Sequence, residues 1–405
     1  MHRSILGLLL IIAALASGSA LAVQSCELNG ERVNPNNGGT TQGKGGLMRC
    51  RDDDGGPVVR EQELQNGVFM GAVRYFKNGA LERDYRVNAR GNRDGLAREY
   101  AVAAFGARPA LVREETLRDG STVGLVRTWY PGGILKRLAF HGDDGAEQAS
   151  VEFNEQGQPS GLRCASRPVL GSDFDDGKAC GHGSGVSNVV LYGAKGQPRA
   201  RVAYERGERR RYEQLWDNGS VRELQESGAA SGVERSFSAE GIKRKETAWV
   251  IEAASGRAAG ERPRRQVTLE QEFHESGKLV HEKRWRSGER AGELASEQHW
   301  YLNGQPRDLT ECIVDNGRPL RRETSFHDNG RKASEGAWAV ATDDARYSAQ
   351  AVGVHRSWDA DGRLRGERSF DDKGRVTRER DLDAAGAVVR NDEVFEDGSR
   401  KAYGK

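Results

Sequence analysis

The chain has 405 residues, of which 36% are hydrophobic and 30% are charged. This hydrophobic content is low for a compact two-layer domain of such length, so the composition favours a thin protein with little interior. The 62 Lys and Arg residues nearly balance the 60 Asp and Glu residues, for a net charge of +2. No sustained basic stripe is present, and no nucleic-acid partner is expected.

The N-terminus has the features of a secretory signal. After a short basic start, the apolar run Ile5–Leu15 and the small-x-small pattern Ala20–Ala22 predict a signal peptide over residues 1–22. The mature protein is therefore expected in the periplasm. The stretch Val23–Cys26 also loosely resembles a lipobox, which leaves lipid attachment at Cys26 open as an alternative.

Residues 23–56 are rich in Gly, Asn and Arg, and we expect them to form a loosely ordered lead-in. The five cysteines of the chain fit an oxidising compartment. Two pairs would each close a short local loop, Cys26 with Cys50 and Cys164 with Cys180. Other connectivities remain open at the level of sequence.

Residues 57–405 repeat a short phrase: an aromatic residue, two or three polar residues, a glycine, and then a hydrophobic residue or proline. Examples are Tyr75–Leu81, Trp129–Leu135, Phe326–Lys332 and Trp358–Leu364. The glycines recur at steps mostly in the twenties, and at steps of twelve near the C-terminus. Because twelve residues make one strand and one turn, this period predicts an array of β-hairpins.

The turns support strands, because Asn-Gly and Asp-Gly pairs favour the tight primed turns of hairpins. Such pairs are Asn78-Gly79, Asn218-Gly219, Asn303-Gly304, Asn329-Gly330, Asp361-Gly362 and Asp397-Gly398. The expected fold is all-β, an elongated array of antiparallel hairpins that forms a single extended, twisted sheet or solenoid. Insertions are expected at about 160–188, 250–266 and 337–352.

The familiar catalytic motifs are missing or incomplete. The stretch Gly181–Gly185 has the wrong order for a nucleophile elbow. His281-Glu282-Lys283 begins like a phospholipase D motif, but Gly288 stands where its aspartate belongs. We therefore expect no catalytic residue, no cofactor and no metal site. The alternative is a hydrolase in the 160–188 insertion, built from Asp173, Asp175, Asp176 or His182.

Aromatic and basic side chains are the candidates for partner binding. The tryptophans are expected mostly to stack in the core of the array, and Trp216, Trp285 and Trp300 are the candidates for exposed contacts. The basic run Arg209, Arg210 and Arg211 could contact an acidic protein face or an anionic lipid, although acidic neighbours favour a solvated role.

The phrase from Tyr75 to Glu82 resembles the MORN-variant repeat of the YwqK-type family, whose members are often described as antitoxins. The phrase Trp358–Leu364 is also similar to YD/Rhs-type repeats. The resemblance implies a MORN-like β-repeat fold and a non-catalytic binder with a protein partner. For an exported chain it implies an immunity protein that neutralises a toxin, such as a type VI secretion lipase or phospholipase, with peripheral proximity to the membrane. A cell-envelope scaffold is the alternative.

Overall fold

The computed structural model describes residues 24–102, 108–183, 185–252, 264–315, 317–340 and 350–402. Within these residues the chain is all-β, with two antiparallel sheets of 12 and 17 strands. The predicted hairpin array is confirmed, although its strands form two sheets rather than one. Contacts divide the chain into two units, residues 1–157 and 158–405, which are described separately. The predicted signal peptide lies outside the described residues.

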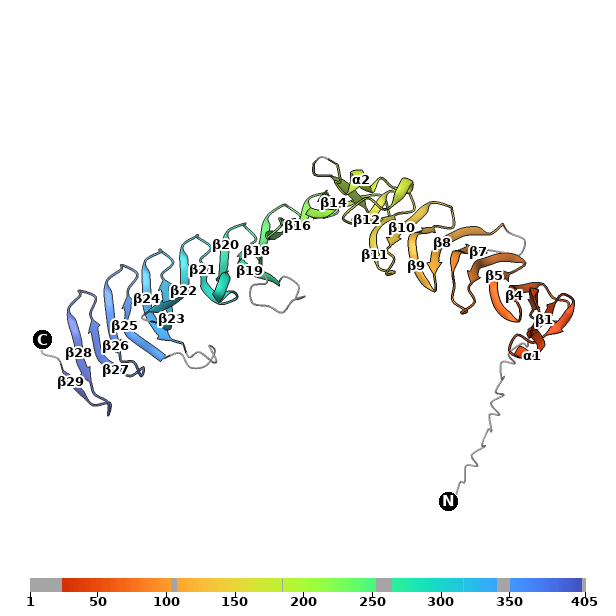
Figure 1. Ribbon diagram of the computed structural model, residues 1–405. Coiled ribbons are helices and arrows are strands. Elements are labelled where there is room, and N and C mark those ends of the chain that lie inside the picture. Colours follow the sequence, from red (N-terminus) through yellow and green to blue (C-terminus); the bar gives the residue numbers. More distant parts are fainter. Residues whose placement is uncertain are drawn as a thin grey trace, which may run out of the picture. The chain divides into compact units, whose positions relative to one another are not determined.

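The first sheet contains β1 to β12, and from β3 to β11 each strand pairs with the next one along the chain (Figure 1). Strand β1 lies between β2 and β3. The elements are β1 (Ser25–Leu28), β2 (Glu31–Val33), α1 (Gly38–Thr41), β3 (Gly46–Arg51), β4 (Val58–Gln65), β5 (Val68–Lys77), β6 (Ala80–Val87), β7 (Gly95–Ala101), β8 (Ala110–Arg118), β9 (Ser121–Trp129), β10 (Leu135–His141), β11 (Glu147–Phe153) and β12 (Pro159–Arg163).

The second sheet contains β13 to β29 in strict sequence order, a meander in which each strand pairs antiparallel with the next. The strands are β13 (Val189–Tyr192), β14 (Pro198–Glu205), β15 (Glu208–Leu215), β16 (Val221–Ser227), β17 (Ser231–Phe237), β18 (Lys243–Glu252), β19 (Arg264–Phe273), β20 (Leu279–Trp285), β21 (Leu294–Trp300), β22 (Pro306–Asp315), β23 (Arg318–Phe326), β24 (Lys332–Ala339), β25 (Gln350–Trp358), β26 (Leu364–Phe370), β27 (Val376–Leu382), β28 (Val388–Val394) and β29 (Arg400–Ala402). Three short helical turns complete the described elements, η1 (Gly171–Asp173), α2 (Asp176–Ala179) and η2 (Gly288–Arg290).

The N-terminal segment differs from the loosely ordered lead-in expected over residues 23–56. Strands β1, β2 and β3 belong to the first sheet, and Cys26 and Cys50 stand opposite each other in register and form a disulfide. Leu28, Met48 and Cys50 are at most 1% exposed and pack with Leu64. The segment is ordered because this small core and the cross-link tie β1 to β3, which composition alone does not reveal.

At several turns the aromatic residue and the hydrophobic residue that flank the turn pair across the hairpin, as the repeat predicts, whereas Phe237 and Phe326 stand opposite Lys243 and Lys332. Phe273 stands opposite Leu279, and Trp358 stands opposite Leu364. Of the six Asn-Gly and Asp-Gly pairs named from the sequence, only one has the expected primed geometry, although Asn29-Gly30, Asn66-Gly67 and Asp119-Gly120 also have positive φ at both residues. At Asn78-Gly79 both residues have positive φ, 53° and 78°.

At the other five pairs only the glycine has positive φ, so the prediction of primed turns there is wrong. Each of these turns has three residues between the paired strand ends, one more than a primed turn has. In the turn after β21, Tyr301 N–H donates to Gln305 O and Gly304 N–H donates to Tyr301 O. The glycine occupies the left-handed position that closes such a longer turn, and a register shift follows at Trp300.

The turn asparagines link successive turns along one edge of the second sheet. The Nδ2 groups of Asn218, Asn303 and Asn329 each donate to a carbonyl of the next turn on that edge, those of Ala239, Asp328 and Ala360. Their Oδ1 atoms accept from the backbone of their own turns. The turn asparagine therefore closes its own turn and holds the next one.

Side chains that begin the turns add to this link. Trp216 Nε1–H donates to Phe237 O at 3.2 Å, and Tyr301 O–H donates to Phe326 O at 2.9 Å. In the first unit, Tyr130 O–H donates to Phe153 O at 3.0 Å. Residues of the repeated phrase therefore make hydrogen bonds from one turn to the next, and each repeat is stabilised mainly by its neighbours.

Each of the three ranges where insertions are expected contains a break between strands and also extends into strands. Residues 160–188 include the end of β12 and then η1 and α2. The range 250–266 includes the end of β18, at Glu252, and the start of β19, at Arg264. The range 337–352 includes the end of β24, at Ala339, and the start of β25, at Gln350. Residues 253–263 and 341–349 lie outside the described residues.

Candidate functional site

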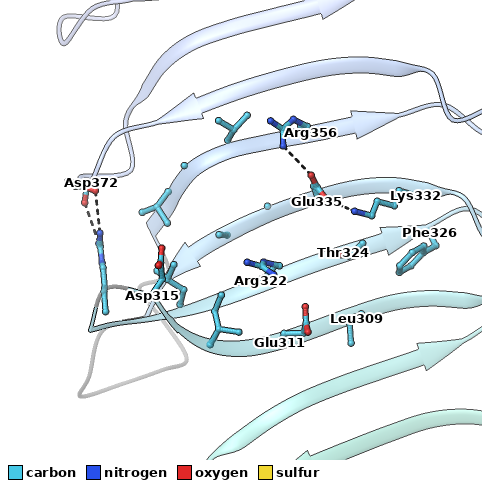
Figure 2. Close-up of a pocket in the computed structure, with 18 residues that line it drawn as sticks. Leu309, Glu311, Asp315, Arg322, Thr324, Phe326, Lys332, Glu335, Arg356 and Asp372 are labelled. Atoms are coloured by element: carbon cyan, nitrogen blue, oxygen red, sulfur yellow. Dashed lines mark hydrogen bonds and ion pairs between the residues drawn. The ribbon is translucent and has the colours of Figure 1, made fainter.

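One face of the second sheet carries an open trough of about 1160 Å³ on strands β22 to β25 (Figure 2). On β22 the lining residues are Leu309, Glu311, Ile313 and Asp315. They alternate along the strand and therefore share one face. The facing strands contribute Arg318, Leu320, Arg322, Thr324, Phe326, Lys332, Glu335, Val352, Val354 and Arg356. The trough therefore mixes apolar and charged side chains on one surface.

Strand register and one long-range contact shape the trough. Glu311 stands opposite Arg322, and Ile313 stands opposite Leu320. At one end, the Arg318 guanidinium lies 3.5 Å from the carboxylate of Asp372, a residue 54 positions later in the turn between β26 and β27. This contact connects the ends of two hairpins, β22–β23 and β26–β27, between which the strands β24 and β25 lie in the sheet.

A row of alternating charges crosses the trough floor. Glu335 accepts from Lys332 Nζ at 2.7 Å and from Arg356 Nη1 at 3.3 Å. The hydrogen bond from Lys332 holds the pKa of Glu335 below its ordinary value, against the opposing effect of burial. Burial raises the pKa of Glu367, but hydrogen bonds from Arg356 and Arg380 outweigh it and lower that pKa. These carboxylates are therefore ionised and paired at neutral pH.

Other charges of the trough are available to a ligand. Within the part of the chain that the structure describes, the side chains of Glu311, Asp315 and Arg322 make no hydrogen bond or ion pair. Val354, which also lines the trough, is 41% exposed. This face of the second sheet therefore exposes apolar side chains together with unpaired charges of both signs.

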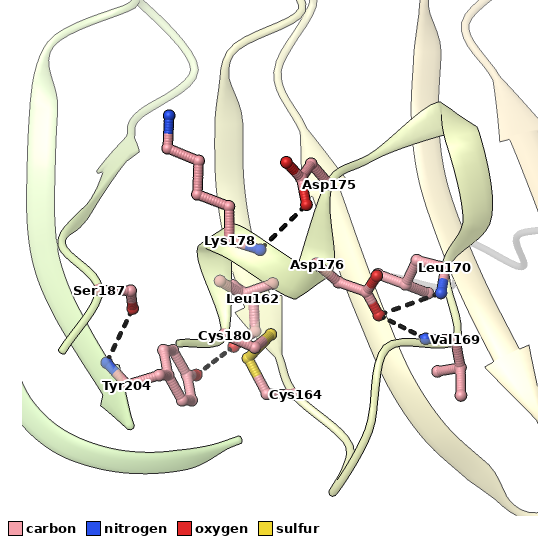
Figure 3. Close-up of a disulfide and its surroundings, with 10 residues drawn as sticks. All are labelled: Leu162, Cys164, Val169, Leu170, Asp175, Asp176, Lys178, Cys180, Ser187 and Tyr204. Carbon is pink, nitrogen blue, oxygen red and sulfur yellow. Dashed lines mark hydrogen bonds between the residues drawn. A yellow bond between two sulfur atoms is a disulfide. The ribbon is translucent and has the colours of Figure 1, made fainter. Parts of the chain in front are cut away.

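The insertion at 160–188 is a compact, cross-linked element (Figure 3). The predicted disulfide between Cys164 and Cys180 is confirmed. The carboxylate of Asp176 is 4% exposed and accepts from the backbone N–H groups of Val169 and Leu170, at 2.7 and 3.0 Å. Leu170 is fully buried.

The insertion is also attached to the first strands of the second sheet. Tyr204 on β14 donates from its hydroxyl to Leu162 O at 2.8 Å, and its backbone N–H donates to Ser187 Oγ at 3.0 Å. Asp175 caps α2 by accepting from Lys178 N–H. Asp175 and Asp176, which the sequence offered as residues of an alternative hydrolase site, thus hold backbone groups in place.

His182 lines a second hollow, of about 1030 Å³, together with Pro168, Phe174 and Tyr192. Its Nε2 atom is buried and has no hydrogen-bond partner among the described residues. Asp175 and Lys178 also line this hollow.

The six residues proposed from sequence for partner binding lie away from the trough. Trp216 is half-buried and its ring is covered by the guanidinium of Arg222, with 4.9 Å between the guanidinium carbon and the ring centroid. Trp285 and Trp300 are half-buried at the ends of β20 and β21. Their role in binding stays a prediction.

The basic run lies on β15 and each guanidinium has a partner. Arg209 donates to Gln225 at 3.2 Å, Arg210 lies 2.8 Å from the carboxylate of Glu208, and Arg211 lies 2.6 Å from that of Glu213. Arg210 and Arg211 also line a smaller hollow of about 640 Å³ with Trp249.

The sequence analysis did not predict the trough. Its alternating residues resemble those of any half-buried strand, and the contact between Arg318 and Asp372 at its end joins residues 54 positions apart.

The second unit also contains a free cysteine and a group of possible metal ligands. Cys312 is the free cysteine of the described chain, and burial raises the pKa of its thiol. One group of side chains could hold a metal ion within the described residues, that of His281, Glu297 and His299. No helix among the described residues is both long enough and apolar enough to span a bilayer.

No protein family model matches the chain, and no curated protein matches it. Among solved structures, the chain is similar to a chain of the Photorhabdus luminescens Tc holotoxin pore, with 8% identity and a TM-score of 0.18 over 89% of this chain and 24% of that chain. A TcdB2–TccC3 structure has 10% identity and a TM-score of 0.16 over 88% and 24% of the two chains.

A porin-like protein from Bacteroides uniformis has 8% identity and a TM-score of 0.17 over 53% of this chain and 85% of that chain. The chain spans about a quarter of the length of the two toxin chains. Similarities with such low TM-scores carry no argument about fold or function, and the resemblance to MORN-variant repeats stays a prediction.

Proposed function

We propose that this chain is a non-catalytic binding protein whose trough on β22 to β25 holds a segment of a toxic protein and so neutralises it. The observation that carries the proposal is the trough, an open surface four strands wide with apolar side chains and unpaired charges. The spacing of neighbouring strands makes four strands about 14 Å across, enough for one helix or one extended loop of a partner.

The chemistry of the trough favours a protein over other ligands. A small-molecule site is concave and largely apolar and encloses most of its ligand, whereas this trough is open along its strands and carries charged residues throughout. A nucleic acid would need an excess of basic residues, whereas the trough presents Glu311 and Asp315 beside Arg318 and Arg322. A protein surface with apolar groups and complementary charges would match this pattern.

The cellular setting supports an immunity role. Two disulfides indicate an oxidising environment outside the cytoplasm. An exported binder with the sequence features of an antitoxin-like repeat would meet a toxin in the periplasm. Neutralisation requires only that the chain cover the active site or the membrane-docking face of that toxin.

The test is affinity capture of the mature chain from an envelope extract, followed by mass spectrometry and an inhibition assay on the captured partner. Wild type is compared with Val354→Arg, which places a long cation in the trough. The matched control is Val314→Arg on β22, because Val314 is 50% exposed and its neighbours Ile313 and Asp315, not Val314, line the trough.

The expected result is one dominant partner with a hydrolase or pore-forming activity, which wild type and Val314→Arg inhibit and Val354→Arg does not. Recovery of several envelope components, none of them toxic, would instead indicate a scaffold. Equal inhibition by the two variants would contradict the assignment of the trough.

A further inference from the structure

A group of ionisable side chains lies on the sheet face opposite the trough, on strands β20 to β22. His281 on β20 stands directly opposite His299 on β21, and His299 stands opposite Asp308 on β22. Glu297 precedes His299 by two residues and therefore points to the same face. Asp308 contacts His299, whereas the next residue on β22, Leu309, lines the trough, so the group and the trough are on opposite faces.

The two imidazoles and one carboxylate converge. His281 Nε2 lies 2.8 Å from Glu297 Oε1, and His299 Nε2 lies 3.9 Å from the same oxygen. The three candidate ligand atoms are all within 4.8 Å of one another. Ligands of a tetrahedral zinc ion at 2.0–2.1 Å are separated by about 3.4 Å, so small side-chain rotations bring these atoms into a coordination shell.

The outer nitrogens of both rings face carboxylates. His299 Nδ1 lies 2.5 Å from Asp308 Oδ1, and His281 Nδ1 lies 3.8 Å from Glu272 Oε2. At His299, the carboxylate on Nδ1 fixes the tautomer in which Nε2 is unprotonated and free to coordinate. At His281, Nε2 donates to Glu297 in the metal-free chain, and a bound ion would replace this proton.

We propose that His281, Glu297 and His299 bind a divalent transition-metal ion, with zinc as the expected occupant. Imidazole and carboxylate ligands suit zinc, and three protein ligands leave a fourth position for water. The three side chains are 22%, 26% and 28% exposed, so the ion can enter from solvent. The ion would cross-link β20 and β21, because it takes ligands from both strands.

Two features of the site oppose the binding of a metal ion. Lys283 Nζ lies 3.2 Å from Glu297 Oε1 and competes with a cation for this oxygen. The two rings are stacked, with centroids 4.2 Å apart and planes within 4°, and they must tilt for both lone pairs to meet one ion. This tilt is a rotation about a soft side-chain torsion.

The experiment is titration of the tag-free, chelator-treated full chain with zinc chloride by isothermal calorimetry at neutral pH. Wild type is expected to bind one ion per chain. The double variant His281→Gln/His299→Gln should lose this binding, and Asp308→Asn should weaken it by about 10- to 100-fold. Lys283→Ala should tighten it by about tenfold, because a competing cation is removed.

His274→Gln is the matched control, because His274 lies in the exposed turn between β19 and β20, and its affinity should equal that of wild type. Visible absorption after cobalt substitution provides a second readout of coordination, and circular dichroism without metal checks that each variant is folded. The proposal is overturned if the double histidine variant retains the wild-type affinity. It is equally overturned if wild type binds several ions weakly, as an adventitious surface does, or if Lys283→Ala and Asp308→Asn leave the affinity unchanged.

Discussion

Replacing Asn303 by aspartate tests whether turn-to-turn hydrogen bonds hold the array together. Asn303 Oδ1 accepts from Gln305 N–H at 2.9 Å, and Asn303 Nδ2 donates to Asp328 O in the next turn at 2.5 Å. An aspartate keeps the acceptor, loses the donor and places a negative charge against a carbonyl oxygen. The substitution therefore removes the bond between turns while it keeps the bond within the turn.

The expected loss is about 1 kcal/mol, the net contribution of one hydrogen bond, which ranges over about 0.5–1.5 kcal/mol. With a urea m-value of about 3 kcal/mol/M, the midpoint should fall by about 0.3 M at an unchanged slope. Tryptophan fluorescence reports this transition, because six of the seven tryptophans lie in the second unit.

The reverse substitution is the control. Asp361 occupies the corresponding turn position, and its carboxylate pairs with Arg363 at 3.0 Å in an exposed setting where ion pairs contribute little. Asp361→Asn supplies an amide donor toward the next turn on that edge and should raise the midpoint slightly. An unchanged midpoint for Asn303→Asp, or a loss of equal size for Asp361→Asn, would refute this role of the turn asparagines.

Three further changes have defined outcomes. The pKa values of Glu335 and Glu367 in the folded chain lie below the ordinary 4.5. The free energy of unfolding should therefore be level at higher pH and fall as the pH drops through these folded-state pKa values. Across this range the urea midpoint of Glu367→Gln should fall less steeply than that of wild type. Removing the disulfide with Cys164→Ser/Cys180→Ser, whose partners are 16 residues apart, should cost about 3 kcal/mol in thermal unfolding, and an unchanged melting temperature would contradict a stabilising role. Gly336→Ala places a Cβ 2.7 Å from the His355 ring, which lies between Trp338 and Phe370, so it should cost about 1–3 kcal/mol, whereas Gly132→Ala, with nothing within 4 Å, should be nearly neutral.

The hairpin array was predictable because its signals are local. An aromatic residue before a turn and a hydrophobic residue after it determine which residues face each other, as Phe273 and Leu279 do. Both disulfides were also predictable, because each closes a short local loop.

The turn geometry was predicted only in part, because an Asn-Gly pair fits both a two-residue primed turn and a longer turn. The two kinds of turn differ in their contacts with neighbouring turns. Asn303 reaches the next turn, whereas no side-chain hydrogen bond links Asn78 to a neighbouring turn among the described contacts. Sequence shows the pair of residues but not what lies beside it.

The trough and the histidine group depend on register and tertiary contacts that sequence does not display. His281 and His299 are 18 residues apart, and they meet only because η2 and the strands around it set the register of β20 and β21. The Arg318–Asp372 contact likewise requires four successive hairpin connections to be placed correctly. Neither arrangement follows from a local motif.

Hydrogen–deuterium exchange of the chain, alone and with its captured toxin partner, tests the binding surface most directly. Backbone amides of β22 to β25, residues Pro306–Trp358, should exchange more slowly in the complex, and those of β1 to β6 should be unchanged. Protection confined to the first unit, or to β15 around Arg209–Arg211, would contradict binding in the trough.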